Sequence, residues 1–533
     1  MRFLFPKLIH MQIFNRFLLM MLMISSAVQA QEPGDALRLS WANPIGTARS
    51  QAIGNAGISL GGDFSSTFIN PAGLAQFKTN EFVFTPGFFM NRNKYSYADS
   101  SFKGNRSNLN IGNIGFIFSS SNRWQSNRVK NVTVSLGLTQ TANLNSNFSY
   151  KGRDVGSSYS EKWLEEISFS GISNVLDIFN LAPIGVVQAY ESYLIDTATI
   201  GGEVRIKTNA NASQMPLNQS FSYQTRGGVY EGAFAVAWNN NEKLFYGVTL
   251  GIPFVNFRRT TTVEERDLSG NTNNDFESFN FRENLTTTGA GANLKLGIIY
   301  KPAAHWRLGF TFHTPSILVL TDKTNATISS NIENYARKVN NDNTRPTSYT
   351  YSTSDYIDGD YITEYTMTTP WRAGASISYV FRENKDITKQ KGFITGDIEV
   401  INYKSNSFSS DVPESKEYLR AVNDAIDNLY QMALNARIGA ELKFKTFMVR
   451  GGVNYMGSPF NEKPEGASKG RRLTPSLGIG YRDKGYFIDL TYAHTIARDF
   501  HVPYFLSEPG VNYPFANNRF TNGQLVATVG FKF

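Results

Sequence analysis

The chain has 533 residues, a formal charge of +8 at pH 7 and no cysteine. Disulfides and thiolate chemistry are therefore excluded, and the basic residues form no block of the kind that marks a nucleic-acid-binding protein. Aromatic residues make up 14% of the chain, and the 40 Phe, 26 Tyr and 44 Gly favour a large antiparallel sheet with tight turns.

Residues 1–30 are predicted to be a signal peptide for export. Its features are the basic residues Arg2, Lys7 and Arg16, the apolar stretch 17–28, and the small-residue cleavage site Val28-Gln29-Ala30. Either Met1 or Met11 fits as the start of this signal, and the alternative is a buried N-terminal helix. No later apolar run approaches the roughly 18 residues that a membrane helix needs. An exported protein with this pattern is soluble, secreted or a β-barrel.

Residues 31–79 are expected to form a compact element ahead of the first strand, because they are rich in Gly and Ala. Within it, Pro71 fixes its own φ and leaves Asn70 extended, while Gly73 permits a tight turn. Such an element is placed to fold into the lumen of a barrel from the periplasmic side.

From residue 80 onward the chain repeatedly alternates apolar and polar residues, which predicts strands. In one example, Ile488, Leu490 and Tyr492 share a face opposite Asp489 and Thr491. We count about 14 such segments, many of about ten residues or more, which is enough to cross a bilayer at a tilt. They lie near residues 80–97, 109–120, 129–142, 228–239, 243–258, 288–301, 304–321, 361–382, 391–404, 432–444, 446–456, 473–482, 484–497 and 520–533.

The gaps between these segments alternate, with short even-numbered gaps and mostly long odd-numbered gaps. This is the pattern of outer-membrane barrels, whose periplasmic turns are short and whose extracellular loops are long. A soluble sheet sandwich also alternates, but a closed barrel explains the gap pattern. The last segment ends on Phe533 and is similar to the signal by which the assembly machinery recognises such barrels; the alternative is an ordinary terminal strand.

Two of the long gaps contain apolar segments. Residues 413–432 predict a helix with Leu419, Val422, Ile426 and Leu429 on one side, and residues 163–194 hold a second apolar cluster. These segments suit capture of an apolar molecule at the mouth of a barrel, or they pack on each other.

The segment 46–75 resembles the N-terminal hatch of FadL-type outer-membrane transporters. The resemblance lies in Gly46-Thr47-Ala48-Arg49, in the run Ala56 to Asp63, and in Asn70-Pro71-Ala72-Gly73-Leu74. It implies a 14-stranded transmembrane barrel over residues 80–533, plugged by a hatch over residues 31–79, that takes up long-chain fatty acids or aromatic hydrocarbons. It also implies a gating role for Asn70, Pro71, Ala72 and Gly73, and a kinked third strand for which Gly137 is a candidate. An interior glycine also serves packing, and the loop 143–227 departs from any pattern that we can match.

The sequence favours no enzyme and no cofactor. Gly57-Ile58-Ser59-Leu60-Gly61 matches a nucleophile motif by letter, but that motif needs a strand before it and a helix after it. The five histidines, His10, His305, His313, His494 and His501, form no metal motif.

The leading hypothesis is ligand-gated passive transport of hydrophobic compounds, most simply long-chain fatty acids, across the outer membrane of a Gram-negative cell. Expected partners are that hydrophobic ligand, outer-membrane lipids and lipopolysaccharide, and the assembly machinery. The alternatives are a general or haem-related channel, a surface adhesin that acts through its loops, and an outer-membrane hydrolase.

Overall fold

The fold is known from a computed structural model. It describes residues 32–41, 46–98, 100–121, 129–169, 177–200, 203–382, 391–413, 415–461, 466–504, 506 and 515–533. The signal peptide predicted over residues 1–30 lies outside these residues.

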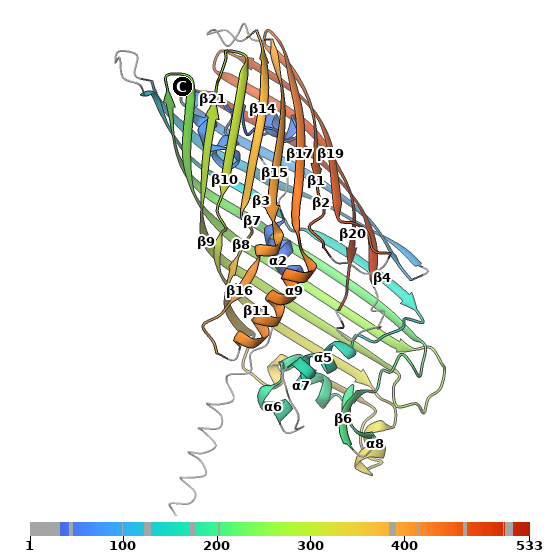
Figure 1. The fold of residues 1–533 in the computed structure, drawn as a ribbon. Helices are drawn as coiled ribbons and strands as arrows, with labels where there is room; N and C mark the ends of the chain where they lie inside the picture. The colour runs from blue at the N-terminus through green and yellow to red at the C-terminus, as the bar shows by residue number, and fades with distance from the viewer. Residues whose placement is uncertain are drawn as a thin grey trace, which may run out of the picture.

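The chain forms a closed antiparallel barrel of 14 strands, as the sequence predicts (Figure 1). Consecutive barrel strands pair along the chain, and β1 closes the circle by pairing with both β2 and β21. Closure removes the free sheet edges that hydrocarbon does not tolerate. The barrel strands are β1 Glu81–Tyr97, β2 Ser100–Ser121, β3 Val129–Asn143, β7 Leu217–Asn240, β8 Leu244–Asp267, β9 Ser278–Tyr300, β10 Trp306–His313, β14 Arg372–Phe381, β15 Gly392–Asn402, β17 Met432–Phe444, β18 Phe447–Met456, β19 Arg471–Asp483, β20 Tyr486–His501 and β21 Ala516–Lys532.

The outer face of the barrel is apolar and its inner face is polar. On β20, Ile488 and Leu490 are exposed on the outside, whereas Asp489 and Thr491 are buried on the inside. The same alternation recurs on β8, β9 and β17. This is the arrangement of a barrel whose exterior contacts lipid.

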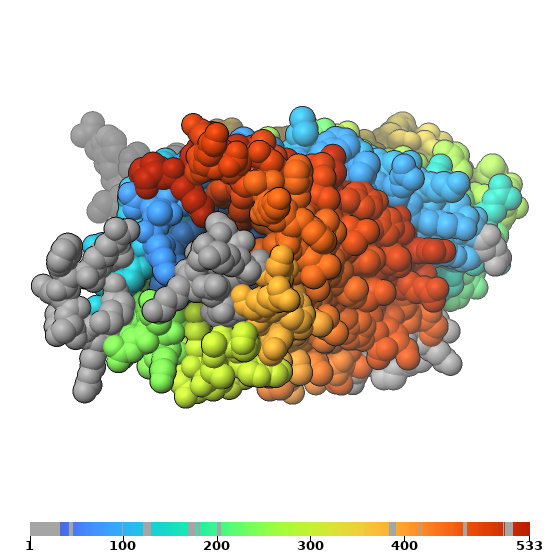
Figure 2. Space-filling view, turned by 90° about the horizontal axis from the view of Figure 1, so that it is seen from above, coloured from blue at the N-terminus to red at the C-terminus, as the bar shows by residue number. Residues whose placement is uncertain are grey.

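The predicted hatch lies inside the barrel, where the blue ribbon runs behind the strands in Figure 1. In the view onto the end that carries the short turns, blue residues from the early chain lie between the red C-terminal strands and the green and yellow strands (Figure 2). The hatch elements are α2 Pro33–Ser40, α3 Ala48–Ala52, α4 Ser66–Ile69 and the 3₁₀ helix η2 Pro71–Gln76.

Glycines on the barrel wall make room for the hatch. Three cross-strand glycine pairs face it, and each pair holds a different part: Gly115 and Gly137 contact Phe64, Gly247 and Gly297 contact Asn70 and Pro71, and Gly439 and Gly452 contact Ile53. A Cβ on Gly247 would stand 2.6 Å from the Pro71 carbonyl carbon, closer than atoms pack. The hatch therefore occupies the space that side chains at these positions of the wall would need.

Three strands of the barrel continue, after a short interruption, into a second strand. At Pro315 and Pro370 the chain leaves the ladder because proline has no N–H to donate. At Leu144 and Asn145 the third strand breaks without a proline. The continuations and the other loop strands are β4 Ser146–Arg153, β11 Ile317–Asn331, β13 Tyr361–Thr368, β5 Ile195–Ile200, β6 Glu203–Thr208, β12 Ser348–Ser352 and β16 Ser407–Ser409.

Helices cover the end of the barrel that carries the long loops (Figure 1). The helix predicted from Pro413 is confirmed as α9, and Leu419, Val422 and Ile426 are buried against Leu37 of α2 and neighbouring strands. The cluster predicted over 163–194 forms α5, α6 and α7, which pack on aromatic residues of the wall. The helical bounds are α5 Glu161–Phe169, α6 Ile178–Leu181, α7 Ile184–Glu191, α8 Tyr335–Asn340, α9 Ser415–Leu429, η4 Thr353–Asp355 and η6 Tyr403–Ser405.

Several strands are longer than the sequence predicts. The segment expected over 228–239 is the second half of β7, which begins at Leu217. Beyond the membrane zone the alternation is inverted, because Phe221 and Tyr223 face inward while Ser222 and Gln224 face outward. The inner face there packs against aromatic residues of β4 and His501 of β20, so the pattern that marks lipid-facing strands ends before the strands do. Within the described part of the chain, no helix combines the length and the apolarity needed to cross a membrane.

A cavity between the hatch and an interrupted strand

Asn70 fastens the hatch to the wall. Its side-chain amide donates to the carbonyl oxygens of Ile58 at 2.7 Å, Phe310 at 3.2 Å and Ile298 at 3.4 Å. Its side-chain oxygen accepts from the backbone N–H of Ala72 at 3.1 Å. One buried amide therefore joins two hatch segments to β9 and β10.

A buried charge network fastens the other side of the hatch. The guanidinium of Arg49 donates to the Glu441 carboxylate at 3.1 Å, and Arg450 donates to the same carboxylate at 2.6 Å. Arg450 also binds Asp489 at 2.5 Å. Each of these buried charges needs its partner, because a buried charge without a partner destabilises the folded protein.

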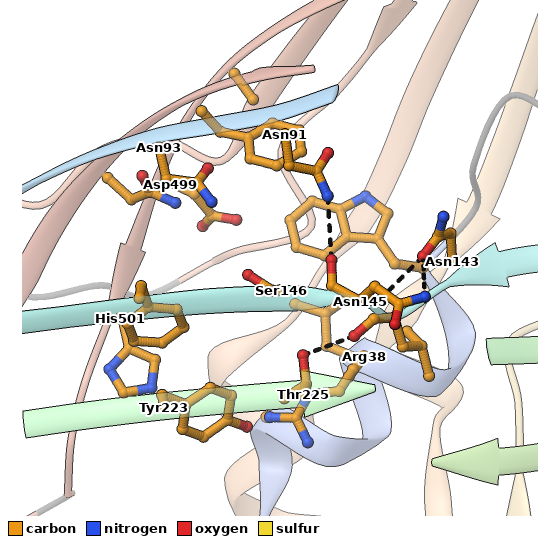
Figure 3. Close-up of a pocket in the computed structure, with 18 of the residues that line it drawn as sticks. Arg38, Asn91, Asn93, Asn143, Asn145, Ser146, Tyr223, Thr225, Asp499 and His501 are labelled. Atoms are coloured by element: carbon orange, nitrogen blue, oxygen red, sulfur yellow. Dashed lines mark hydrogen bonds between the residues drawn. The ribbon is translucent and has the colours of Figure 1, made fainter. Parts of the chain in front are cut away.

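A cavity of about 430 Å³ lies between α2 and the strands of the wall. Helix α2 begins with Pro33 in its first turn and a capping box between Glu32 and Asp35, which satisfies backbone groups at its start. Its Ala36 and Leu37 are buried, so the helix is held in place and its Arg38 is presented to the cavity. Figure 3 shows Arg38 beside Tyr223, and the His501 ring lies next to Tyr223 with 5.4 Å between the ring centroids.

The part of the cavity wall around Arg38 combines aromatic rings with paired charges. Arg38 lies over the rings of Tyr223 and Phe257, at 5.7 and 5.1 Å from their centroids, and forms an ion pair with Asp35. Arg259 is shared between Asp35 at 3.4 Å and Glu283 at 2.8 Å. Two cations and two carboxylates therefore balance each other at this wall.

A second charge cluster lies where α5 covers the cavity. Lys162 reaches Glu32 at 3.1 Å and Glu166 at 3.8 Å. Burial tends to raise the pKa of Glu32, but the charges of Lys162 and Arg259 outweigh it and lower that pKa to about 2. Burial raises the pKa of Glu166 to about 7 despite Lys162, and the nearby Glu32 and Glu283 add to this rise.

Another part of the cavity wall is lined by uncharged side-chain amides. Asn91 donates to the carbonyl oxygen of Asn145 at 3.0 Å (Figure 3). Asn110 donates to Gln140 at 2.5 Å. The Asn and Gln residues that line the cavity are Gln51, Asn91, Asn93, Asn110, Gln140, Asn143, Asn145, Asn518, Asn522 and Gln524. This section offers many hydrogen-bonding groups without net charge.

The cavity reaches the place where β2 and β3 separate. Their ladder runs from Ser121 to Asn113 on β2 and stops there, although β2 continues to Ser100. The third strand has a bulge between Gln140 and Ala142, breaks after Asn143, and then pairs only with β7. Residues from both sides of this separation line the cavity. Across this separation the side-chain amide of Asn110 on β2 donates to Gln140 on β3, so side chains span the place where the backbone ladder ends.

The predicted site residues occupy three different places. Asn70 is extended, as expected from Pro71. Together with Ala72 and Gly73 it is buried where the hatch contacts the wall, and it does not line the cavity. Gly137 lies in a regularly paired stretch of β3, between Gly115 on β2 and Ala233 on β7, and the strand is interrupted seven residues further on. Phe533 is exposed, and its backbone N–H donates to Asn80 at 3.2 Å.

The residues weighed for catalysis have structural contacts. Ser59 lies in a turn of the hatch, with its hydroxyl 2.7 Å from that of Ser376, and no strand precedes it. His313 contacts the Ile69 carbonyl oxygen at 3.0 Å, and His501 contacts the Tyr150 hydroxyl at 3.0 Å. Across the described ranges, no group of acidic and histidine side chains is arranged to hold a metal ion.

Sequence reasoning did not identify the cavity lining. A signal was present at Asn91 and Asn93, because they are separated by one residue on a strand and so share a face. Arg38 had no such signal, since its position depends on how α2 enters the lumen.

No family model matches the chain, and no curated protein matches it. Among solved structures, a Pseudomonas aeruginosa FadL homologue matches with a TM-score of 0.55 at 12% identity, over 93% of this chain and 100% of that chain. The Pseudomonas putida toluene transporter TodX matches with a TM-score of 0.52 at 12% identity, over 92% of this chain and 99% of that chain. The chain has the FadL-type fold.

The FadL-type fold thus extends over nearly all of the chain, the hatch included. At 12% identity, the likeness concerns the course of the backbone. The side chains that line the cavity are therefore interpreted from this chain alone.

Proposed function

We propose that the protein passes small hydrophobic molecules across the outer membrane of a Gram-negative cell by passive diffusion. The observation that carries the proposal is the course of the cavity, whose lining runs from the aromatic rings beside α2 to the separation of β2 and β3. Between the cavity and the end that carries the short turns, the hatch fills the lumen. A sideways route serves a molecule that is more soluble in lipid than in water, whereas a sugar or an ion needs an open pore.

Two similar structures support this class of cargo, since one is a FadL homologue and the other is a toluene transporter. Long-chain fatty acids are our first candidate. Their chains suit the rings of Phe221 and Tyr223, and the guanidinium groups of Arg38 and Arg259 are suited to bind a carboxylate that displaces Asp35.

Uptake of labelled oleate and labelled toluene by cells that express the chain tests the proposal. Uptake above that of empty cells supports it, and equal uptake of both probes would reject it. Swelling of protein-containing liposomes in small sugars would instead favour an open channel, and surface binding without uptake would favour an adhesin.

Two substitutions distinguish the cargo. Arg38→Gln removes a carboxylate partner and should lower oleate uptake about three- to tenfold while leaving toluene uptake unchanged. Asp35→Asn frees Arg38 and Arg259 and should raise oleate binding. If neither change separates the two probes, the fatty acid assignment is wrong and a neutral hydrocarbon replaces it.

A further inference from the structure

Five neighbouring strands each place one cation at the same level of the sheet, on its outer face. Arg471 on β19 stands opposite Arg498 on β20, which stands opposite Arg519 on β21. Arg519 stands opposite Lys94 on β1, and Lys94 stands opposite Lys103 on β2. We call these five residues the basic row.

The basic row faces outward at the end of the barrel that carries the long loops. All five side chains are exposed, whereas their strand neighbours Tyr95 and Ala497 are buried on the inside. On β19 and β20 the next outward residues toward the middle of the barrel are the exposed apolar Leu473 and Ile496. On β1, β2 and β21 the corresponding residues are Arg92, Asn105 and Thr521. The row therefore adjoins the apolar surface directly on β19 and β20, and polar residues separate it from that surface on the other three strands.

The row lacks compensating charge from the protein. Like charges directly opposite each other on paired strands repel, and this row contains four such pairs in succession. No acidic side chain among the residues that the structure describes forms an ion pair with any of the five. The cations on the inner face differ, since Arg450 and Arg259 each have two carboxylate partners.

We propose that the basic row binds the phosphate groups of lipopolysaccharide in the outer leaflet. The proposal rests on the proposed outer-membrane location. Neighbouring strands lie about 4.8 Å apart, so adjacent guanidinium and ammonium groups can share one phosphate. The acyl chains of the same lipid then lie along Leu473 and Ile496, which a free phosphate ion does not explain.

The test measures binding of lipid A to the detergent-solubilised full chain by native mass spectrometry. The row variant replaces Arg471, Arg498, Arg519, Lys94 and Lys103 by Gln. The matched control replaces five exposed lysines at the opposite end of the barrel by Gln, namely Lys78, Lys243, Lys391, Lys445 and Lys484, which changes the net charge equally. We expect the row variant to bind bisphosphorylated lipid A about tenfold or more weakly than the wild type, and the control to bind it normally.

Dephosphorylated lipid A serves as the second probe. It should bind weakly to the wild type, and high salt should weaken the binding of bisphosphorylated lipid A. Equal binding of both lipids, or normal binding by the row variant, would overturn the proposal. Oleate uptake by the same variants is a separate readout: failed uptake by the wild type defeats the transport function and leaves the lipid A result standing.

Discussion

The ring of Phe64 fills the space beside Gly137 in which a side chain would otherwise stand. Gly137 is paired in register with Gly115, and both glycines border the same ring. The glycine thus gives the hatch a place against the third strand, and the interruption of that strand at Leu144 and Asn145 has a separate origin.

Gly137→Ala should therefore loosen the hatch and leave the course of the strand intact. The added methyl group collides with Phe64, at a cost of about 1–3 kcal/mol. Thermal unfolding, followed by the loss of the compact barrel band on gels, should shift to a lower temperature. In a Phe64→Ala background the same substitution should cost much less, because the two residues share one contact. Additive effects would show that Gly137 acts without Phe64.

Asn70→Ala should make the closed barrel leak. The change removes three donated hydrogen bonds and the cap of η2, and each buried bond contributes about 1 kcal/mol. Liposome swelling in small sugars should rise above that of the wild type. Asn271→Ala in the exposed loop after β8 is the matched control and should not leak. If the Asn70→Ala variant does not leak, contacts other than those of Asn70 keep the barrel closed.

The sequence predicted the barrel and the hatch because both leave local patterns. Alternation with apolar outer residues, as in Ile488 and Leu490, follows from contact with lipid, and Pro71 fixes the turn at Asn70 without help from the rest of the fold. The extension of β7 before residue 228 was missed because Phe221 and Tyr223 pack inward there, against aromatic residues of β4 and His501, so the apolar positions change faces. A search for strands with apolar residues on the outer face finds the lipid-facing zone and misses the zone in which the apolar residues face inward.

The cavity was beyond prediction because its walls come from distant segments. Arg38 from the start of the chain, Tyr223 from the middle and His501 from the end meet only after the barrel closes (Figure 3). The break after Asn143 is equally nonlocal, since it appears only where pairing to β2 ends while pairing to β7 continues.

Arg450→Met should destabilise the barrel far more than Arg49→Met. Without Arg450, Asp489 and Glu441 lose their closest partner, which costs about 3–5 kcal/mol for a buried ion pair. Without Arg49, Glu441 keeps Arg450 at 2.6 Å, so the smaller loss falls on the hatch. Thermal unfolding of both variants measures the difference, and equal shifts would contradict this division of roles.

The loop helix α5 should be held less firmly as the pH rises from about 5 to 7. Burial and the nearby carboxylates raise the pKa of Glu166 from 4.5 to about 7, so the docked helix binds this proton more tightly than the undocked helix. Deprotonation therefore favours release, and the stability of docking falls across this window. Glu32, with a pKa of about 2, is already ionised there and adds no change.

Hydrogen exchange of the α5 amides, corrected for the intrinsic rate at each pH, checks this dependence. Glu166→Gln should make protection nearly independent of pH, and Glu165→Gln should keep the wild-type dependence. Protection that rises with pH in the wild type would reverse the assigned sign.

Joining the two sides of the separation between β2 and β3 should stop uptake without disturbing the fold. The chain has no cysteine, so Asn110→Cys with Gln140→Cys introduces the only two thiols, at side chains that contact each other across the gap. A short reversible thiol cross-linker should lower oleate uptake to that of empty cells, because the sideways route is then closed, and reductant should restore it. Each single cysteine variant should transport normally after the same treatment. Unchanged uptake by the cross-linked protein, with the cross-link verified by mass spectrometry, would mean that the cargo leaves the cavity elsewhere.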